Sequence, residues 1–254
     1  MGVAATTASG LRTAEIDQTP TALRALVEHR EDLVKARTQT VNRLHGLLTS
    51  LISGGAPTAL TAGKAAELLR SVRPRSLSGR TIRRLAVELV AEVRHLDRRL
   101  ASATGELTAA LEVSGSTLTE LAGIGPVTAA KIVARVGPVT RFRSEAAFAS
   151  YTGTAPIEAS SGEVVRHHLS RAGDRQLNSA LHMAAITQIR LDTPGRDYYR
   201  RKRAEGKNHK EALRCLKRRL SDSVYRHMQR DAREALGAGP EGHSGAALSS
   251  CAAG

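Results

Sequence analysis

Two long stretches of this chain carry apolar residues at helical spacing, and they limit the folds that the sequence can adopt. In residues 21–52 the recurring apolar positions include Leu23, Leu26, Val27, Leu33, Val34, Val41, Leu44, Leu47 and Leu48. In residues 81–112 they include Leu85, Leu89, Val93, Leu96, Leu100, Leu107 and Leu111. Apolar residues at steps of three and four form one stripe along a helix. Narrow stripes with charged flanks predict either an antiparallel coiled-coil hairpin or two helices of an ordinary bundle.

The composition favours a core built from helices. Only 2% of the 254 residues are aromatic and the chain has no Trp, so the core must consist of Leu, Val, Ile and Ala. Leu and Ala favour helices. No stretch shows sustained alternation of apolar and polar residues, although residues 163–169 could form a short strand. We therefore predict an all-α protein with one large domain or two small ones.

Changes in composition divide the chain into four segments. Residues 1–20 are small or polar and are expected to form a loose tail, and residues 21–112 form the coiled-coil-like hairpin, which contains a short helix near 61–72. Residues 113–230 should form a compact helical domain, and residues 231–254 a disordered tail. In the compact domain we expect helices near 117–122, 126–136, 144–151, 173–191, 195–205 and 208–229.

An excess of positive charge indicates a polyanionic partner. The chain has 38 Lys and Arg against 24 Asp and Glu, which gives a formal net charge of +14. Between Pro194 and Arg230 the surplus alone is +9. Within that segment the candidate phosphate contacts are Arg201, Lys202, Arg218 and Arg219. Tyr198 and Tyr199 lie beside them and could stack on bases or pack in the helical core.

Nucleic acid is favoured over a membrane as the partner. No segment is apolar for 18 residues, no lipidation motif stands out, and the first residues lack the pattern of a secretory signal. Cys215 and Cys251 lie far apart and lack metal-ligand spacing, which fits a reducing compartment. We therefore expect a cytoplasmic protein without a membrane partner.

Residues 118–136, "LTELAGIGPVTAAKIVARV", have the pattern of a hairpin that holds phosphate. Leu118 and Leu121 would end one helix, "GIG" would form a tight turn, and Pro126 suits the first position of the next helix. Glycines permit positive φ and close backbone approach, and the first amides of a helix face an anion. The pattern resembles the helix-hairpin-helix motif, although Gly and Pro also stabilise plain turns. The candidate contacts are Gly123, Ile124, Gly125, Thr128 and Lys131.

Four motifs in order carry a wider resemblance. "LAGIGPVTAAKIVARVG", "RFRSEAAFASYTGTAP", "SSG" and "LSRAGDRQLNSALH" are together similar to the C-terminal transposase domain of the IS-one-ten insertion-sequence family, relatives of the Piv DNA invertases. The resemblance covers about residues 21–230, including the helical hairpin. It implies DNA recombination, by strand cleavage and rejoining, guided by a structured RNA that the element encodes.

The resemblance also implies a serine nucleophile that attacks the DNA phosphodiester. The serine that best matches the family, by its distance from Pro156 and its following glycine, is Ser161, and Ser160 is the fallback. A serine needs a base or metal to take its proton and a cation to hold the phosphate. Arg166 and Arg171 are near in sequence and could hold it.

Complete members of the family begin with an RNase-H-like domain whose four acidic residues bind divalent metal, and this chain starts where that domain should end. We therefore expect an N-terminally truncated transposase with no cofactor or metal site of its own, since the family's Mg²⁺ belongs to the missing domain. Such a chain should bind DNA or a guide RNA without cutting alone. The alternatives are a non-enzymatic helix-hairpin-helix architectural protein and an interaction module. The interaction module would act through the hairpin on full-length transposases. In any of these cases we expect the hairpin to assemble a homo-oligomer or to bind full-length transposase.

Overall fold

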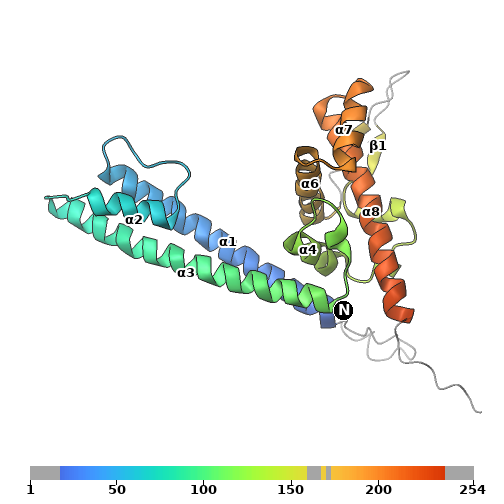
Figure 1. Ribbon diagram of the computed structural model, residues 1–254, viewed down its shortest axis with the longest axis horizontal. Coiled ribbons are helices and arrows are strands. Elements are labelled where there is room, and N and C mark those ends of the chain that lie inside the picture. Colours follow the sequence, from blue (N-terminus) through green and yellow to red (C-terminus); the bar gives the residue numbers. More distant parts are fainter. Residues whose placement is uncertain (1–17, 159–166, 170–172, 238–254) are drawn as a thin grey trace, which may run out of the picture. The chain divides into compact units, whose positions relative to one another are not determined.

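The computed structural model describes residues 18–158, 167–169 and 173–237, and these residues are almost entirely helical (Figure 1). The helices are α1 Gln18–Leu51, α2 Ala62–Ser71, α3 Leu77–Val113, α4 Pro126–Val136, α5 Glu145–Tyr151, α6 Arg175–Arg190, α7 Pro194–Ala204 and α8 His209–Gly237. Leu118–Glu120 (η1) and Val139–Arg141 (η2) are 3₁₀ turns, and Pro156–Glu158 (β1) pairs antiparallel with His167–Leu169 (β2). The all-α prediction is confirmed. Of the short strand expected near 163–169, residues 167–169 form β2, and residues 163–166 lie outside the described part.

The described residues divide into two compact units. The hairpin unit contains residues 18–114 and 125–137, and the C-terminal unit contains residues 115–124 together with the described residues from 138 onward. This division differs from the expected one, because α4 groups with the long hairpin and not with the helices that follow it.

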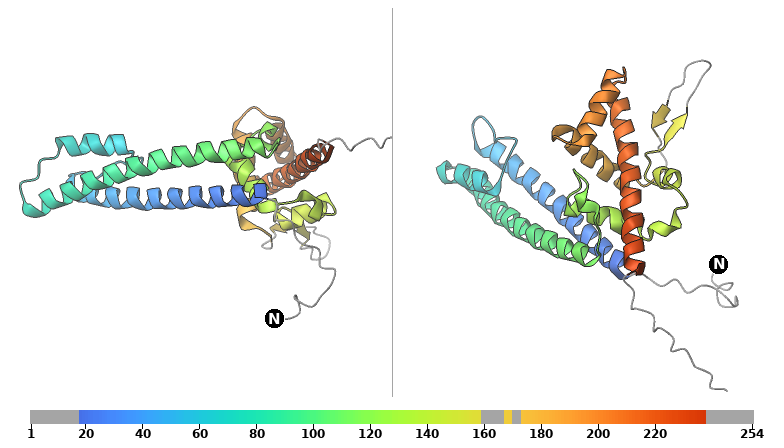
Figure 2. Two further views of the ribbon diagram at one scale, coloured as in Figure 1. Left: turned by 90° about the horizontal axis from the view of Figure 1, so that it is seen from below. Right: turned by 45° about the vertical axis from the view of Figure 1, so that its right-hand side comes forward.

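The long helices α1 and α3 lie side by side and run antiparallel, as Figures 1 and 2 show. Polar bridges fix their register: Arg30 Nε donates to Thr104 Oγ1 at 3.0 Å, and Arg37 pairs with Asp97. From the first bridge to the second, the chain advances seven residues on α1 and goes back seven residues on α3, as expected for antiparallel helices. The residues of α3 buried in the unit are Ala86, Leu89, Val90, Val93, Leu96, Ala103, Leu107 and Leu111. Most of their steps are three or four residues, as predicted, but Leu85 of the predicted stripe is 38% exposed.

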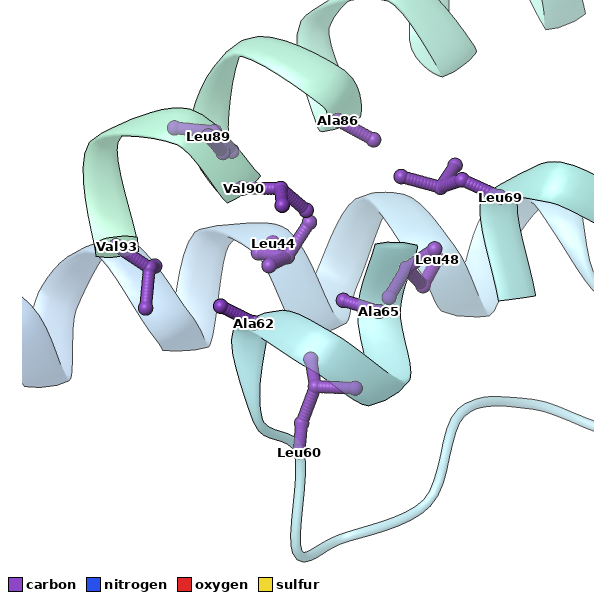
Figure 3. Packing of buried hydrophobic residues seen from close by; sticks show 10 residues of the cluster. All are labelled: Leu44, Leu48, Leu60, Ala62, Ala65, Leu69, Ala86, Leu89, Val90 and Val93. Carbon is purple, nitrogen blue, oxygen red and sulfur yellow. The ribbon is translucent and has the colours of Figure 1, made fainter. Parts of the chain in front are cut away.

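A compact cluster of apolar side chains forms where α2 packs against α1 and α3 (Figure 3). Thr61 caps α2 by accepting a hydrogen bond from the Lys64 amide. The buried members of the cluster are Leu44, Leu48, Leu60, Ala62, Ala65, Leu69, Ala86, Leu89, Val90 and Val93. Small residues on α2 let it approach the two long helices closely, so this short helix completes the core there.

Helix α4 packs on α1 and α3. Five of its eleven residues are buried, and Arg24 of α1 donates to the Ala134 carbonyl at 3.1 Å. The expected α-helix near 117–122 is only the single turn η1. Gly115 and Gly123 have φ of +66° and +84°, which interrupts a right-handed helix on both sides of η1.

The C-terminal unit is organised around α8, which packs against α5, α6 and α7. An aromatic cluster lies between α5 and α8: Phe148 is fully buried, and its ring centroid lies 5.3 Å from Phe142 and 5.4 Å from Tyr225. In the described part of the chain, no helix is both long and apolar enough to cross a membrane.

Two helices extend into the segments that were expected to be tails. Helix α1 already begins at Gln18, within the expected tail 1–20, and α8 continues to Gly237, beyond the expected limit at 230. The extension of α8 has a physical cause, since Asp231 accepts hydrogen bonds from the amide and hydroxyl of Thr117, at 2.9 and 2.6 Å. The residues of both expected tails beyond these helices lie outside the described part.

Candidate nucleic-acid interface

The turn at residues 121–124 is held against α6. The Ala122 carbonyl accepts a hydrogen bond from Gln188 Nε2 at 2.6 Å, and a Cβ on Gly123 would lie 2.6 Å from the Ala184 carbonyl oxygen. Ile124 is 3% exposed. Gly123 is therefore required for packing inside the protein, whereas the sequence pattern suggested an approach to another molecule. Gly125 differs, because nothing lies within 4 Å of the position of its Cβ.

The candidates on α4 begin at an exposed helix end and continue into an ion pair. Gly125 is the N-cap of α4 and Pro126 occupies its first turn, as the sequence predicted. Thr128 is half-buried one turn further on. Lys131 forms an ion pair with Glu31 of α1, and their side chains are 24% and 26% exposed. Lys131 would have to give up this carboxylate before it could contact a phosphate.

A ring of cations surrounds Tyr198 on α7. The guanidinium carbons of Arg201 and Arg219 lie 5.3 and 4.9 Å from the ring centroid, and the Lys202 ammonium lies 5.6 Å from it. We call these four residues the Tyr198 cluster. Glu205 accepts a hydrogen bond from Lys202 at 2.7 Å and lies 4.0 Å from Arg201, so these two cations share one carboxylate. The hydrogen bond from Lys202 lowers the pKa of the Glu205 carboxyl.

The neighbouring candidate, Arg218, is placed differently. It forms an ion pair with Asp222 one helical turn along α8, and both side chains are largely buried, at 28% and 18% exposed. Burial lowers the pKa of the Arg218 guanidinium. Its charge is therefore compensated within the protein, whereas Arg219 is exposed and, in the described part of the chain, its partner is the Tyr198 ring.

Neither tyrosine of α7 is packed in the core. In the described structure α7 has no buried residue, and both tyrosines are half-buried. Tyr199 Oη lies 2.7 Å from Nδ1 of His209, and its ring meets the imidazole edge-on. The faces of Tyr198 are occupied by cations, so its part in the site is to hold them in place.

The candidate nucleophile cannot be placed. Ser160, Ser161, Arg166 and Arg171 lie outside the described residues. The strands that flank residues 159–166 are described, and Glu158 pairs with His167 in their ladder.

The turn that leads into β1 is fixed by buried polar groups that the sequence interpretation did not select. Asn178 Nδ2 donates to the carbonyls of Thr152 and Gly153, at 3.2 and 2.7 Å, and the Thr152 hydroxyl lies 3.1 Å from that of Ser221. The ammonium group of Lys217 donates to Asn178 Oδ1. Lys217 is 6% exposed, and burial lowers the pKa of its ammonium group.

The sequence contains a pattern that indicates the burial of Lys217. Lys217 follows Leu213 by four residues and precedes Leu220 by three, so the apolar spacing of α8 already places it on the buried face.

A divalent metal would need several acidic or histidine ligands. Among the described residues, no three His, Cys, Asp or Glu side chains gather in a way that could hold a metal ion. The residues described here therefore do not form the metal centre that the family resemblance implies.

Comparison with known proteins gives one family for this chain. Residues 115–200 match the model of the IS116/IS110/IS902 transposase family. The chain is similar to the 43.6 kDa protein of insertion element IS110 from Streptomyces coelicolor, with 32% identity over 86% of this chain and 66% of the relative. It is also 28% identical to the 44.8 kDa protein of insertion element IS116 from Streptomyces clavuligerus, over 87% of this chain and 67% of the relative.

A third relative is a probable family 20 transposase from Pseudomonas aeruginosa, 29% identical over 66% of this chain and 51% of the relative. The chain thus spans about two thirds of the length of the two insertion-element proteins and about half that of the third.

Proposed function

The chain belongs to the IS116/IS110/IS902 family of transposases, and we propose that it acts in transposition by binding the sugar-phosphate backbone of nucleic acid through the Tyr198 cluster. The single observation that carries this proposal is the local surplus of charge in the cluster. Three cations surround one ring, and Glu205 is the carboxylate that two of them share. Positive charges that lie this close together repel one another, and a bound anion would offset that repulsion.

The geometry of the cluster suits phosphate. The cations of the cluster lie within 5.6 Å of one ring centroid, and a guanidinium group can form two hydrogen bonds to one phosphate. The ring also fixes the side chains before binding, so less rotamer entropy is lost when a strand is bound. Arg219 is exposed and Arg201 is 64% exposed, so both can reach a ligand.

The remaining candidate residues would make secondary contacts to nucleic acid. Gly125 and Thr128 lie at the start of α4, where backbone amides favour an anion. Lys131 and Arg218 are already paired with carboxylates, so binding a phosphate would replace one charge partner by another with little net gain. We therefore assign the main electrostatic contribution to the Tyr198 cluster.

The proposed partner is duplex DNA of the insertion element, with the structured RNA of the element as a second ligand. Contacts to phosphate set position and affinity but do not read sequence. Binding through this cluster should therefore show little preference among sequences. For strand cleavage we propose Ser161 as the nucleophile, on the family resemblance alone.

The proposal is tested by the salt dependence of binding. Removing one cation that neutralises a phosphate should reduce the slope of log affinity against log salt by about 0.9. Replacing Arg201→Ala and Arg219→Ala together should therefore reduce the slope by about 1.8. Fluorescence anisotropy with a labelled duplex of about 30 base pairs, measured across a salt series, provides the readout.

The matched control replaces two exposed arginines of the hairpin unit, Arg80→Ala and Arg84→Ala, and removes the same net charge. The control should retain the slope of the unaltered chain. A salt-independent affinity, or equal effects of the two double variants, would refute binding through the Tyr198 cluster.

A further inference from the structure

A second exposed cation of the C-terminal unit rests on aromatic rings, and the Tyr198 cluster does not include it. The guanidinium carbon of Arg141, at the end of η2, lies 4.5 Å from the ring centroid of Phe142 and 4.5 Å from that of Tyr151. Arg141 is exposed, and both ring residues are half-buried. Arg143 is also exposed, two residues further along the chain. We call these four residues the Arg141 platform.

The rings of the platform are held from the interior of the unit. The ring centroids of Phe142 and Tyr151 lie 5.1 Å apart, and Phe142 meets the fully buried Phe148 edge-on at 5.3 Å. The Phe142 carbonyl accepts a hydrogen bond from Tyr225 Oη of α8 at 3.0 Å. The rings are therefore a fixed support for an exposed guanidinium group, which aromatic faces attract.

The charge of the platform has no counter-charge in the described part of the chain, where neither Arg141 nor Arg143 forms an ion pair with a carboxylate. The acidic residue nearest to them in the sequence is Glu145, and it accepts a hydrogen bond from Arg226 Nε at 2.9 Å. Arg218, by contrast, pairs with a carboxylate one turn away. Two like charges thus lie two residues apart at the surface, and a bound anion would offset their repulsion.

The platform and the Tyr198 cluster lie on different sides of α8. Arg219 of α8 belongs to the Tyr198 cluster, whereas Tyr225 of α8 contacts Phe142 of the platform. Arg219 and Tyr225 are six positions apart, which is about 1.7 turns of an α-helix. They therefore point in different directions, and the platform is a separate surface of the same unit.

We propose that the Arg141 platform is a second contact surface for the phosphate backbone of a nucleic-acid strand, with Arg141 and Arg143 as the residues that contact phosphate. A guanidinium group can stack on aromatic rings and still form two hydrogen bonds to one phosphate. The two rings restrict Arg141 before binding, so less side-chain entropy is lost when the phosphate is bound. The choice of nucleic acid as the partner rests on the proposed function, whereas the exposed and uncompensated charge does not.

The first test measures the salt dependence of duplex binding in the full chain. Arg141→Ala and Arg143→Ala together should reduce the slope of log affinity against log salt by about 1.8, since each neutralised phosphate contributes about 0.9. The same reduction should add to that of the double variant of the Tyr198 cluster, because separate surfaces contribute independently. The control Arg80→Ala and Arg84→Ala removes the same net charge from the hairpin unit and should leave the slope unchanged.

A second variant keeps the charge of the platform and removes the planar group. Arg141→Lys should lower the affinity at a fixed salt concentration several-fold and leave the slope unchanged, because an ammonium group retains the charge but not the paired hydrogen bonds. Arg80→Lys, the same change at an exposed position of α3, should leave both unchanged. All of these positions are exposed, so each variant should retain the helical circular-dichroism spectrum.

The outcomes separate this inference from the proposed function. If the Tyr198 double variant reduces the slope and the Arg141 double variant acts like its control, the platform is not a contact surface, while the Tyr198 cluster stands. If only the Arg141 double variant reduces the slope, the platform stands and binding through the Tyr198 cluster is wrong. An Arg141→Lys variant that binds as tightly as the unaltered chain would overturn the contact through a stacked guanidinium group.

Discussion

Gln188 and Ala122 are joined by a hydrogen bond from the side-chain amide to the backbone carbonyl, 2.6 Å long. Gln188 is 8% exposed, and Gly195 at the start of α7 lies so close that a Cβ there would overlap the amide. One buried side chain thus connects α6 to the turn before α4 and to the start of α7. The glycine of that turn therefore serves the packing of the C-terminal unit.

The first prediction separates the two glycines of the "GIG" turn. Gly123→Ala places a Cβ 2.6 Å from the Ala184 carbonyl oxygen at a φ of +84°. Strain of the left-handed conformation and overpacking should together cost about 2–4 kcal/mol of unfolding free energy. Gly125→Ala meets nothing within 4 Å at a φ of −86° and should cost less than about 1 kcal/mol. Urea unfolding measures both, and equal losses would contradict the packing role of Gly123.

The second prediction concerns the dry seam of the helical hairpin. Leu96 of α3 is 6% exposed, and Leu96→Asp would bury an unpaired carboxylate. The variant should lose about 3–5 kcal/mol, or neutralise the new side chain at a similar cost. Leu77→Asp is the same change at a residue that is 74% exposed, at the first position of α3, where an acidic residue is favourable. Thermal melting should therefore separate the two variants, and a Leu96→Asp melting temperature equal to that of Leu77→Asp would show that the seam is not dry.

The two helices of the hairpin were predictable because the apolar spacing that indicates each helix lies within a short stretch of sequence. Apolar steps of three and four residues place the stripe on one face of each helix, whatever that face packs against. The position of α4 was not predictable in this way. Its buried residues pack on the long hairpin, but the same small apolar face could have packed on the helices that follow it. Only the tertiary structure decides between these two arrangements.

In the candidate site, too, local sequence patterns reveal some of the contacts but not those between distant residues. Arg218 and Arg219 look equivalent in the sequence, yet Asp222 lies four residues after Arg218, and that spacing could have revealed the ion pair. Lys217 could have been found from the apolar spacing of α8. The hydrogen bonds from Asn178 to the carbonyls of Thr152 and Gly153 join residues far apart in the sequence, so no local pattern encodes them.

The third prediction tests the difference between the adjacent arginines. Arg219→Ala should weaken duplex binding and reduce its salt slope by about 0.9, the value for a single phosphate. The double variant Arg218→Ala and Asp222→Ala removes a compensated pair and leaves the net charge unchanged. It should retain the affinity and slope of the unaltered chain in the same anisotropy assay. If the double variant binds as weakly as Arg219→Ala, then Arg218 contacts the strand despite its partner.

The last prediction concerns the serines that the family resemblance selects. Attack by a serine Oγ on a phosphodiester forms a bond from Oγ to phosphorus and releases one sugar oxygen, so the strand end becomes covalently attached to the protein. The chain should form this adduct when magnesium and a protein supplying the family's RNase-H-like acidic domain are present. A labelled strand that migrates with the protein on a denaturing gel reports it. Ser161→Ala should abolish the adduct, and the matched Ser160→Ala should retain it. An adduct that survives Ser161→Ala but not Ser160→Ala would move the nucleophile by one residue, and one that survives both would place it elsewhere in the chain.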